Sequence, residues 1–145
     1  MKPRTTHDTV LEFMRSQSIG VETSVSSSGT PQAAVVGYVV TERLEIFFDT
    51  VDSTRKAKNL RENPRIAFVI GGLSAGDERT VQFQGVVDEP SGIELERLKE
   101  LYFGRFPDGR ERLKWQGLLY FRARPTWLRF SDFTQTPPEI AEFDF

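Results

Sequence analysis

The stretch DTVDSTRKAKNLRENPR, residues 49–65, contains a complete change of secondary structure and decides how the chain is organised. Good helix formers fill Ser53–Glu62, and the Asn-Pro pair that follows at 63–64 is a typical helix stop. Strand-forming residues precede this stretch at Leu44–Phe48 and follow it at Ile66–Ile70. The sequence therefore predicts a strand, a short helix and a buried strand in succession.

Outside this stretch, short apolar segments alternate with turns. In Val21–Val25 and Val81–Val87, mostly apolar positions alternate with mostly polar ones, with the period of two that is typical of a strand. A turn rich in serine, glycine and proline separates the first of them from an apolar run at Ala33–Val40. Most connections have hairpin length, which favours antiparallel pairing. We therefore expect a mainly β fold, a six- to seven-stranded and mostly antiparallel barrel with peripheral helices over 1–133, and an irregular tail at 134–145.

The remaining segments predict further helices and strands around this barrel. Thr6–Arg15 and a segment that begins after Ser91 have apolar residues at helical spacing. Two more strands are expected on either side of Pro125, at Leu118–Ala123 and Trp127–Phe133.

The composition excludes several classes of protein and site. The chain has 145 residues and a net charge of −2, which argues against a general nucleic-acid binder and against binding to anionic membranes. It has no cysteine and one histidine, His7, so thiolate and multi-histidine metal sites are excluded. The longest apolar run is too short to span a membrane. We expect a cytoplasmic protein with no metal, nucleic-acid or membrane partner.

A basic island lies within the central helix and its flanks. Five cationic residues stand against one acidic residue between 54 and 65, although the whole chain is anionic. Some of the cations fall in the first helical turn, where the helix dipole disfavours them and unpaired backbone N–H groups attract anions. This pattern fits a phosphate site, and it also fits an ordinary solvated helix face. The cations are Arg55, Lys56, Lys58, Arg61 and Arg65.

Taken together, these segments resemble the pyridoxamine 5′-phosphate oxidase-like flavoproteins, whose fold is the FMN-binding split β-barrel. The resemblance covers most of the chain, about 9–133. Its most specific part is the combination of Ser/Thr-Arg-Lys, Asn-Leu and Asn-Pro-Arg within 53–65, in the context of strand, helix and strand. The segments Phe47–Thr50 and Val81–Gly85 add to it. The resemblance implies a homodimer with the flavin site at the subunit interface.

The resemblance also implies which residues bind the cofactor FMN. The Arg-Lys pair would bind the phosphate together with the hydroxyl groups that precede it, and the end of the preceding strand would contact ribityl and phosphate. An earlier strand would lie along the flavin, and a polar residue of a later strand would touch the ring. The implied cofactor-binding residues are Ala34, Val35, Val36, Gly37, Val39, Asp49, Thr50, Ser53, Thr54, Arg55, Lys56, Thr80 and Gln82.

The chain also departs from the true oxidases of this family. Val39 stands where they place a basic residue, and Trp127–Phe145 lacks their C-terminal pattern. We therefore do not expect efficient oxidation of pyridoxamine phosphate, and no catalytic residue is assigned. The resemblance instead implies an FMN-dependent oxidoreductase or flavin reductase that uses a nicotinamide or a small organic molecule. The alternatives are a deazaflavin F420-dependent reductase or heme-binding relative of the same fold, a non-catalytic flavin-binding stress-associated protein, and a barrel without a cofactor.

Overall fold

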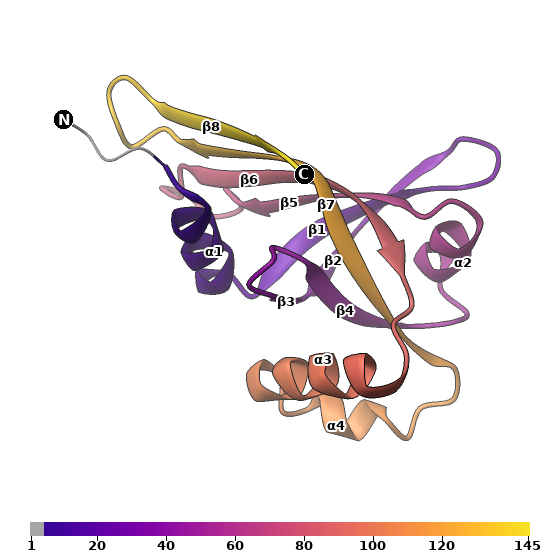
Figure 1. Ribbon diagram of the computed structural model, residues 1–145. Coiled ribbons are helices and arrows are strands. Elements are labelled where there is room, and N and C mark those ends of the chain that lie inside the picture. Colours follow the sequence, from indigo (N-terminus) through magenta and orange to yellow (C-terminus); the bar gives the residue numbers. More distant parts are fainter. Residues whose placement is uncertain (1–4) are drawn as a thin grey trace.

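All eight strands among the described residues, 5–145, belong to one antiparallel sheet in this computed structural model (Figure 1). The sheet order is β2-β1-β5-β6-β7-β4-β3, and β8 pairs with β7. The strands are β1 (Ile19–Val25), β2 (Pro31–Gly37), β3 (Val39–Val40), β4 (Ile46–Val51), β5 (Arg65–Gly71), β6 (Arg79–Asp88), β7 (Leu118–Asp132) and β8 (Glu139–Asp144). The helices are α1 (His7–Ser16), α2 (Arg55–Glu62), α3 (Gly92–Arg105) and α4 (Gly109–Arg112). The mainly β, antiparallel architecture expected from the sequence is confirmed.

The longest strand of the curled sheet, β7, pairs with three other strands. β6 runs along one edge of β7, whereas the first half of β7 pairs with β4 and the second half with β8. The pairing with β6 shifts register between Gln84 and Gly85, opposite Pro125, whose ring nitrogen carries no N–H for the ladder. Glycine is required at this point because a Cβ on Gly85 would lie 2.3 Å from the Arg124 carbonyl oxygen.

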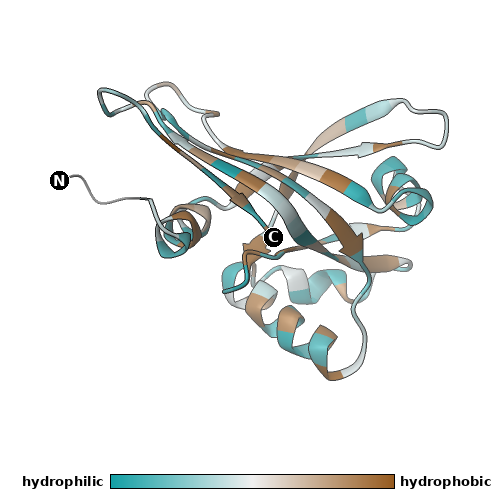
Figure 2. Cartoon of the chain, turned by 45° about the horizontal axis from the view of Figure 1, so that its top comes forward, coloured by the Kyte–Doolittle hydropathy of each residue, from teal (hydrophilic) through white to brown (hydrophobic). Residues whose placement is uncertain are grey.

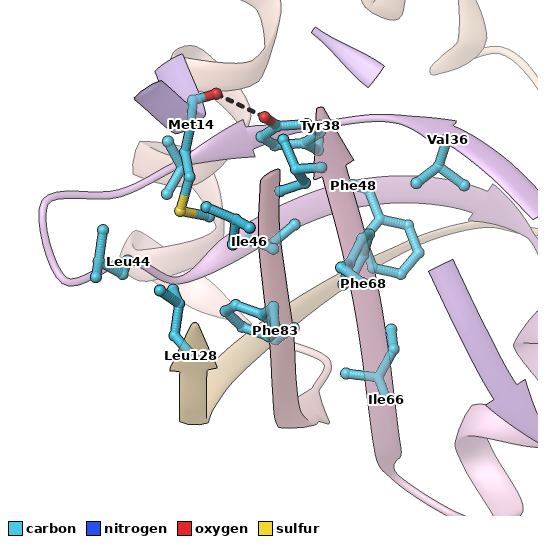
Figure 3. Close-up of a cluster of buried hydrophobic side chains, with 14 of the residues drawn as sticks. Met14, Val36, Tyr38, Leu44, Ile46, Phe48, Ile66, Phe68, Phe83 and Leu128 are labelled. Carbon is cyan, nitrogen blue, oxygen red and sulfur yellow. Dashed lines mark hydrogen bonds between the residues drawn. The ribbon is translucent and has the colours of Figure 1, made fainter. Parts of the chain in front are cut away.

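Aliphatic and aromatic side chains together fill the space inside the curled sheet (Figure 3). Phe48 of β4 and Phe68 of β5 meet edge to face with ring centroids 5.8 Å apart, although their strands are not neighbours in the sheet. Phe83 of β6 packs on Phe68 in the same manner. α1 closes one end of this core, where the Tyr38 hydroxyl donates to the Met14 carbonyl oxygen at 2.6 Å.

A second apolar layer lies between α3 and the opposite face of β4. Phe47 of β4 and Tyr120 of β7 stack with ring centroids 5.3 Å apart, and Leu98 and Tyr102 of α3 pack with them. Alternate residues of β4 therefore enter different layers, as the pleat of a strand requires. Figure 2 shows the contrast between α3, which carries apolar and polar stripes, and α2, which is mostly hydrophilic.

Two helix starts follow from local side-chain bonds. The Thr6 side chain accepts from the Thr9 backbone N–H and caps α1. α2 begins at Arg55 rather than at Ser53, because the Thr54 side chain accepts from the Ala57 backbone N–H at 3.2 Å and so takes the N-cap position.

The expectation of an irregular tail is wrong over Glu139–Asp144, which form β8. Phe143 packs against the core and Glu142 forms an ion pair with Arg129 of β7. The second half of β7 would otherwise present unpaired N–H and C=O groups along one edge, and β8 satisfies them.

Two strand boundaries also differ from the expected ones. The two strands expected around Pro125 are one continuous strand, β7, because the register shift accommodates the proline. The apolar run expected as one strand divides at Tyr38 into β2 and β3, which lie at opposite ends of the sheet order. Residues 1–4 of the expected 1–133 domain lie outside the described residues.

Candidate functional site

The start of α2 forms a polar corner at the end of β4. The Thr50 and Thr54 hydroxyl oxygens lie 3.0 Å apart, and the Thr54 hydroxyl also donates to the Val51 carbonyl oxygen at 2.9 Å. The helix geometry leaves the backbone N–H groups of Arg55 and Lys56 without an intrahelical acceptor. Hydroxyl groups and free N–H donors therefore meet at one point.

A shallow pocket of about 370 Å³ opens on one side of this corner. Its cations are Arg55, Lys58 and Arg61, which follow one another at helical spacing along α2. Arg61 is already paired with Glu89 at 2.9 Å. Ser53 and Thr54 line the pocket too, together with the carboxylates of Asp52 and Glu62. The Ser53 hydroxyl and two cations without an ion pair among the described residues, Arg55 and Lys58, therefore face the same space.

Lys56 lies on a different face of α2 from Arg55. It is half-buried, it is not part of this pocket, and its charge acts on Glu22 of β1. Successive residues of an α-helix are rotated by about 100°, so neighbours in the sequence point to different sides. The structure therefore brings Ser53, Thr54 and Arg55 together and directs Lys56 toward the sheet.

A buried carboxyl group lies beside Lys56. Glu22 is fully buried, and neither carboxylate oxygen has a hydrogen-bond partner among the described residues. Burial raises the pKa of Glu22 to about 7, and the positive charge of Lys56 acts in the opposite direction. Next to it, the Asn59 amide donates to the Ser24 hydroxyl at 3.1 Å. This group is not predictable from the sequence, because Glu22 alternates with Val21 and Val25 along β1 and hydropathy would place the valines inside.

Asp49 and Thr50 point to opposite sides of β4. The Asp49 carboxylate accepts from the Tyr102 hydroxyl at 3.1 Å and from the Arg112 Nε at 2.8 Å. Burial, and then the negative charge of Asp49, raise the pKa of Tyr102 above its ordinary range. The structure therefore places Thr50 at the α2 corner and commits Asp49 to α3 and α4.

The strands that the sequence analysis assigns to the flavin ring present an apolar row on the outer face of the sheet. The register places Val35, Val21 and Val69 side by side on β2, β1 and β5, and Gln82 of β6 follows them. Val35 is 61% exposed and Val69 is 41% exposed. Thr80 lies on the same face of β6 as Gln82, two residues away.

Three other residues assigned to the ring strand do not lie in this row. Ala34 and Val36 alternate with Val35 along β2 and face inward, and Val36 is buried in the core. Val39 is buried with Phe47 in the second apolar layer.

A larger cavity, of about 890 Å³, lies between α1, β3 and α3. Val39 and Tyr38 form part of its wall, and Arg105 lines it from α3. The Arg105 guanidinium donates to the carbonyl oxygens of Arg15 at 2.7 Å and Gln17 at 3.0 Å. This cation therefore ties α3 to the end of α1.

Two further findings concern residues 5–145 as a whole. No helix in this range is long and apolar enough to cross a membrane. No group of three or more histidine, cysteine, aspartate or glutamate side chains in the same range is arranged to hold a metal ion.

The family model described as Pyridoxamine 5′-phosphate oxidase matches residues 6–130. The chain belongs to this family. The match includes β4, α2 and β5, which surround the polar corner, and it ends within β7. No curated protein matches the chain in sequence.

Solved structures share the fold at low sequence identity. The heme binding protein from Mycobacterium smegmatis has a TM-score of 0.83 and 16% identity, over 99% of this chain and 60% of that one. The present chain thus spans about 60% of the length of that protein. HutZ, the heme storage protein from Vibrio cholerae, has a TM-score of 0.73 and 18% identity, over 85% of this chain and 91% of that one. A pyridoxamine 5′-phosphate oxidase-related, FMN binding protein from Nostoc punctiforme PCC 73102 has a TM-score of 0.63 and 9% identity, over 88% of this chain and 86% of that one.

Proposed function

We propose that the chain binds FMN through a phosphate site at the start of α2 and acts, as a homodimer, as a flavin-dependent oxidoreductase. The observation that carries this proposal is the polar corner, where hydroxyl groups, free backbone N–H groups and cations converge. Membership of the family and the FMN-binding neighbour support it.

The residues of the corner fit a phosphate group. The Ser53 hydroxyl and the two free N–H groups would donate hydrogen bonds to the phosphate oxygens, while Thr50 and Thr54, whose hydroxyls are bonded to each other and to the Val51 carbonyl, would hold the helix start in place. Arg55 would add a two-pronged, charge-assisted contact, and Lys58 a second positive charge. The phosphate would thereby anchor one end of the cofactor.

The outer face of the sheet fits the flavin ring and a second subunit. The row Val35, Val21 and Val69 is apolar and partly exposed, and it begins on the edge strand β2. A second copy of the chain would cover this face and hold the ring between the two subunits. FMN, when bound, supplies the redox chemistry, and the side chains of this chain orient it and exclude water. A nicotinamide or a small organic molecule is the expected reaction partner.

The large cavity argues against efficient oxidation of pyridoxamine phosphate. Val39 contributes an apolar wall, and the Arg105 guanidinium is already bonded to two backbone carbonyl groups. A doubly charged substrate phosphate would therefore find little compensation there. We therefore do not propose a phosphate ester as the substrate.

A deazaflavin F420-dependent reductase is the second candidate. The row of cations along α2 extends from Arg55 past Lys58 to Arg61, and a long anionic tail could follow it. Heme fits the described residues less well. The chain has a single histidine, His7, which is exposed beside Phe145, with ring centroids 6.3 Å apart, and lines none of the cavities described above.

The test is a parallel titration of the purified protein with FMN and with riboflavin, which lacks the phosphate. We expect FMN to bind at least about tenfold more tightly, because the corner contributes charge-assisted hydrogen bonds. Equal affinities would overturn the phosphate site. A visible spectrum of the protein as purified separates flavin from heme, and a nicotinamide oxidation assay with FMN tests the reaction.

A further inference from the structure

A cavity of about 760 Å³ adjoins the 890 Å³ cavity between α1, β3 and α3, and it is lined by five arginines. It lies between α3, the turn that connects β3 to β4, and β7. Three glutamates also line it, so five cations face three anions in a chain whose net charge is −2. The arginines are Arg15, Arg43, Arg97, Arg122 and Arg124, and the glutamates are Glu42, Glu45 and Glu94.

Two of these arginines are committed to the fold. The Arg122 side chain is 8% exposed and donates to Asp88 at 2.6 Å and to Glu94 at 2.9 Å. Arg97 donates to the same Glu94 carboxylate at 2.7 Å. These bonds hold α3 against β7 and neutralise Glu94, so that carboxylate does not offset the remaining arginines.

Of the other three guanidinium groups, two have no partner within residues 5–145 and the third, that of Arg124, forms only long ion pairs. Among the described residues, those of Arg15 and Arg43 form no ion pair or hydrogen bond. Arg124 lies 3.5 Å from Glu45 and 3.7 Å from Asp88 without a hydrogen bond to either. Guanidinium groups present paired N–H donors that match a carboxylate, so two unpaired ones beside the weakly paired Arg124 favour an anionic ligand.

The two cavities form one trough with different halves. Arg15 and Leu101 line both of them. The 890 Å³ half is walled mainly by apolar and aromatic side chains, which include Val39, Val40 and Phe106. A ligand that lies along the trough would therefore have an apolar body at one end and a negative charge at the other.

We propose that this trough binds amphiphilic carboxylates, molecules with an apolar or aromatic body that end in a carboxylate group. The carboxylate would lie between Arg43 and Arg124, and the body would pack on Leu101 and Phe106. As a binding site the trough stands without flavin.

The experiment uses two fluorescent probes with the same body, pyrenebutyrate and its neutral analogue pyrenebutanol, and the full chain without added flavin. Fluorescence anisotropy measures both affinities. We expect pyrenebutyrate to bind at least about tenfold more tightly, because guanidinium–carboxylate bonds are charge-assisted. The double variant Arg43→Gln, Arg124→Gln should remove this difference and leave the affinity for pyrenebutanol unchanged.

Two further variants make the result specific. Leu101→Gln should weaken both probes alike, because it alters the apolar wall that they share. Arg65→Gln, which removes an exposed guanidinium on β5, should change neither affinity. Equal binding of the two probes to the unaltered chain, or an unchanged preference in the double variant, would overturn the proposal. The FMN titration is a separate measurement, so failure here leaves the phosphate site standing.

Discussion

Two carboxyl groups of the sheet, the buried Glu22 on β1 and the largely buried Asp49 on β4, have opposite surroundings. The Asp49 side chain is 12% exposed and is bonded to both Arg112 and Tyr102. Glu22 is fully buried, and its oxygens have no hydrogen-bond partner among the described residues. Asp49 therefore holds α3 and α4 on the sheet, whereas the burial of Glu22 opposes folding when the group is ionised.

This difference distinguishes Asp49, whose carboxylate has a structural role, from Glu22, which adjoins the candidate site. Lys56, whose charge acts on Glu22, is the second residue of the helix whose start forms the phosphate corner. Buried ionisable groups with shifted pKa values concentrate at functional sites. Glu22 is thus the buried acid that is coupled to the α2 corner, and Asp49 is not.

The largest effect is expected when Asp49 loses its counter-ion. Arg112→Ala leaves a largely buried carboxylate without its cation, which should lower the free energy of unfolding by about 3 kcal/mol. Urea denaturation measures this change. The matched control is Arg110→Ala, which breaks an exposed pair with Glu100 and should cost less than about 1 kcal/mol. Equal losses in the two variants would contradict the structural role of Asp49.

The second prediction concerns the pH dependence that Glu22 confers. Its pKa is about 7 in the folded chain against an ordinary value of 4.5, so the folded state retains a proton that the unfolded state releases. The stability contribution is thus fully present below about pH 4.5 and falls by up to about 3 kcal/mol as the pH rises through 7. Glu22→Gln should remove this part of the slope in denaturation curves between pH 5 and about 8. Parallel curves for the two proteins would show that Glu22 does not titrate in this range.

The third prediction compares two buried tyrosines of the layer under α3. Tyr102→Phe removes a hydroxyl that donates to the Asp49 carboxylate, and it should cost about 1.5 kcal/mol of unfolding free energy. Tyr120→Phe removes a buried hydroxyl without a partner among the described residues, so it should be neutral or stabilising. Thermal denaturation distinguishes the two. A larger loss of stability for Tyr120→Phe than for Tyr102→Phe would contradict the hydrogen bonding described for these two hydroxyl groups.

The smallest effect is expected at Lys56. Its positive charge lowers the pKa of Glu22, so Lys56→Met should move the titration of Glu22 to higher pH. Carbon NMR of the Glu22 carboxyl group follows this titration directly. Lys58→Met, on the face of α2 that lines the pocket, is the control and should leave it in place. If Lys58→Met shifted the Glu22 titration and Lys56→Met did not, Lys58 rather than Lys56 would be the lysine whose charge acts on Glu22.

The sequence was sufficient to predict the strand, helix and strand around α2 because its helix formers and helix stop are local signals. β8 was missed because a six-residue tail becomes a strand only when the edge of β7 is available. The second half of β7 has a free edge because β4, a strand far away in the chain, pairs only with its first half. The break at Tyr38 was missed for the same reason, since it depends on Tyr38 packing under α1.

The candidate site was predictable as a segment but not side chain by side chain. Family resemblance pointed to Arg55 and Lys56 as a pair, and Asp49 and Thr50 as another. Helical rotation separates the first pair, and strand pleating separates the second. These two periodicities can be applied to a sequence alone. The burial of Glu22 cannot be obtained in this way, because one face of β1 is apolar, with Val21 and Val25, and hydropathy would place that face inside rather than the face of Glu22.

The most direct test of the central claim is calorimetric titration of FMN into Arg55→Ala beside Arg65→Ala. Both variants lose one exposed guanidinium near α2, but only Arg55 lines the pocket at the start of the helix. We predict that Arg55→Ala weakens FMN binding roughly 10- to 150-fold, while its affinity for riboflavin and the FMN affinity of Arg65→Ala stay unchanged. Equal FMN affinities in the two variants would contradict a phosphate site at the start of α2.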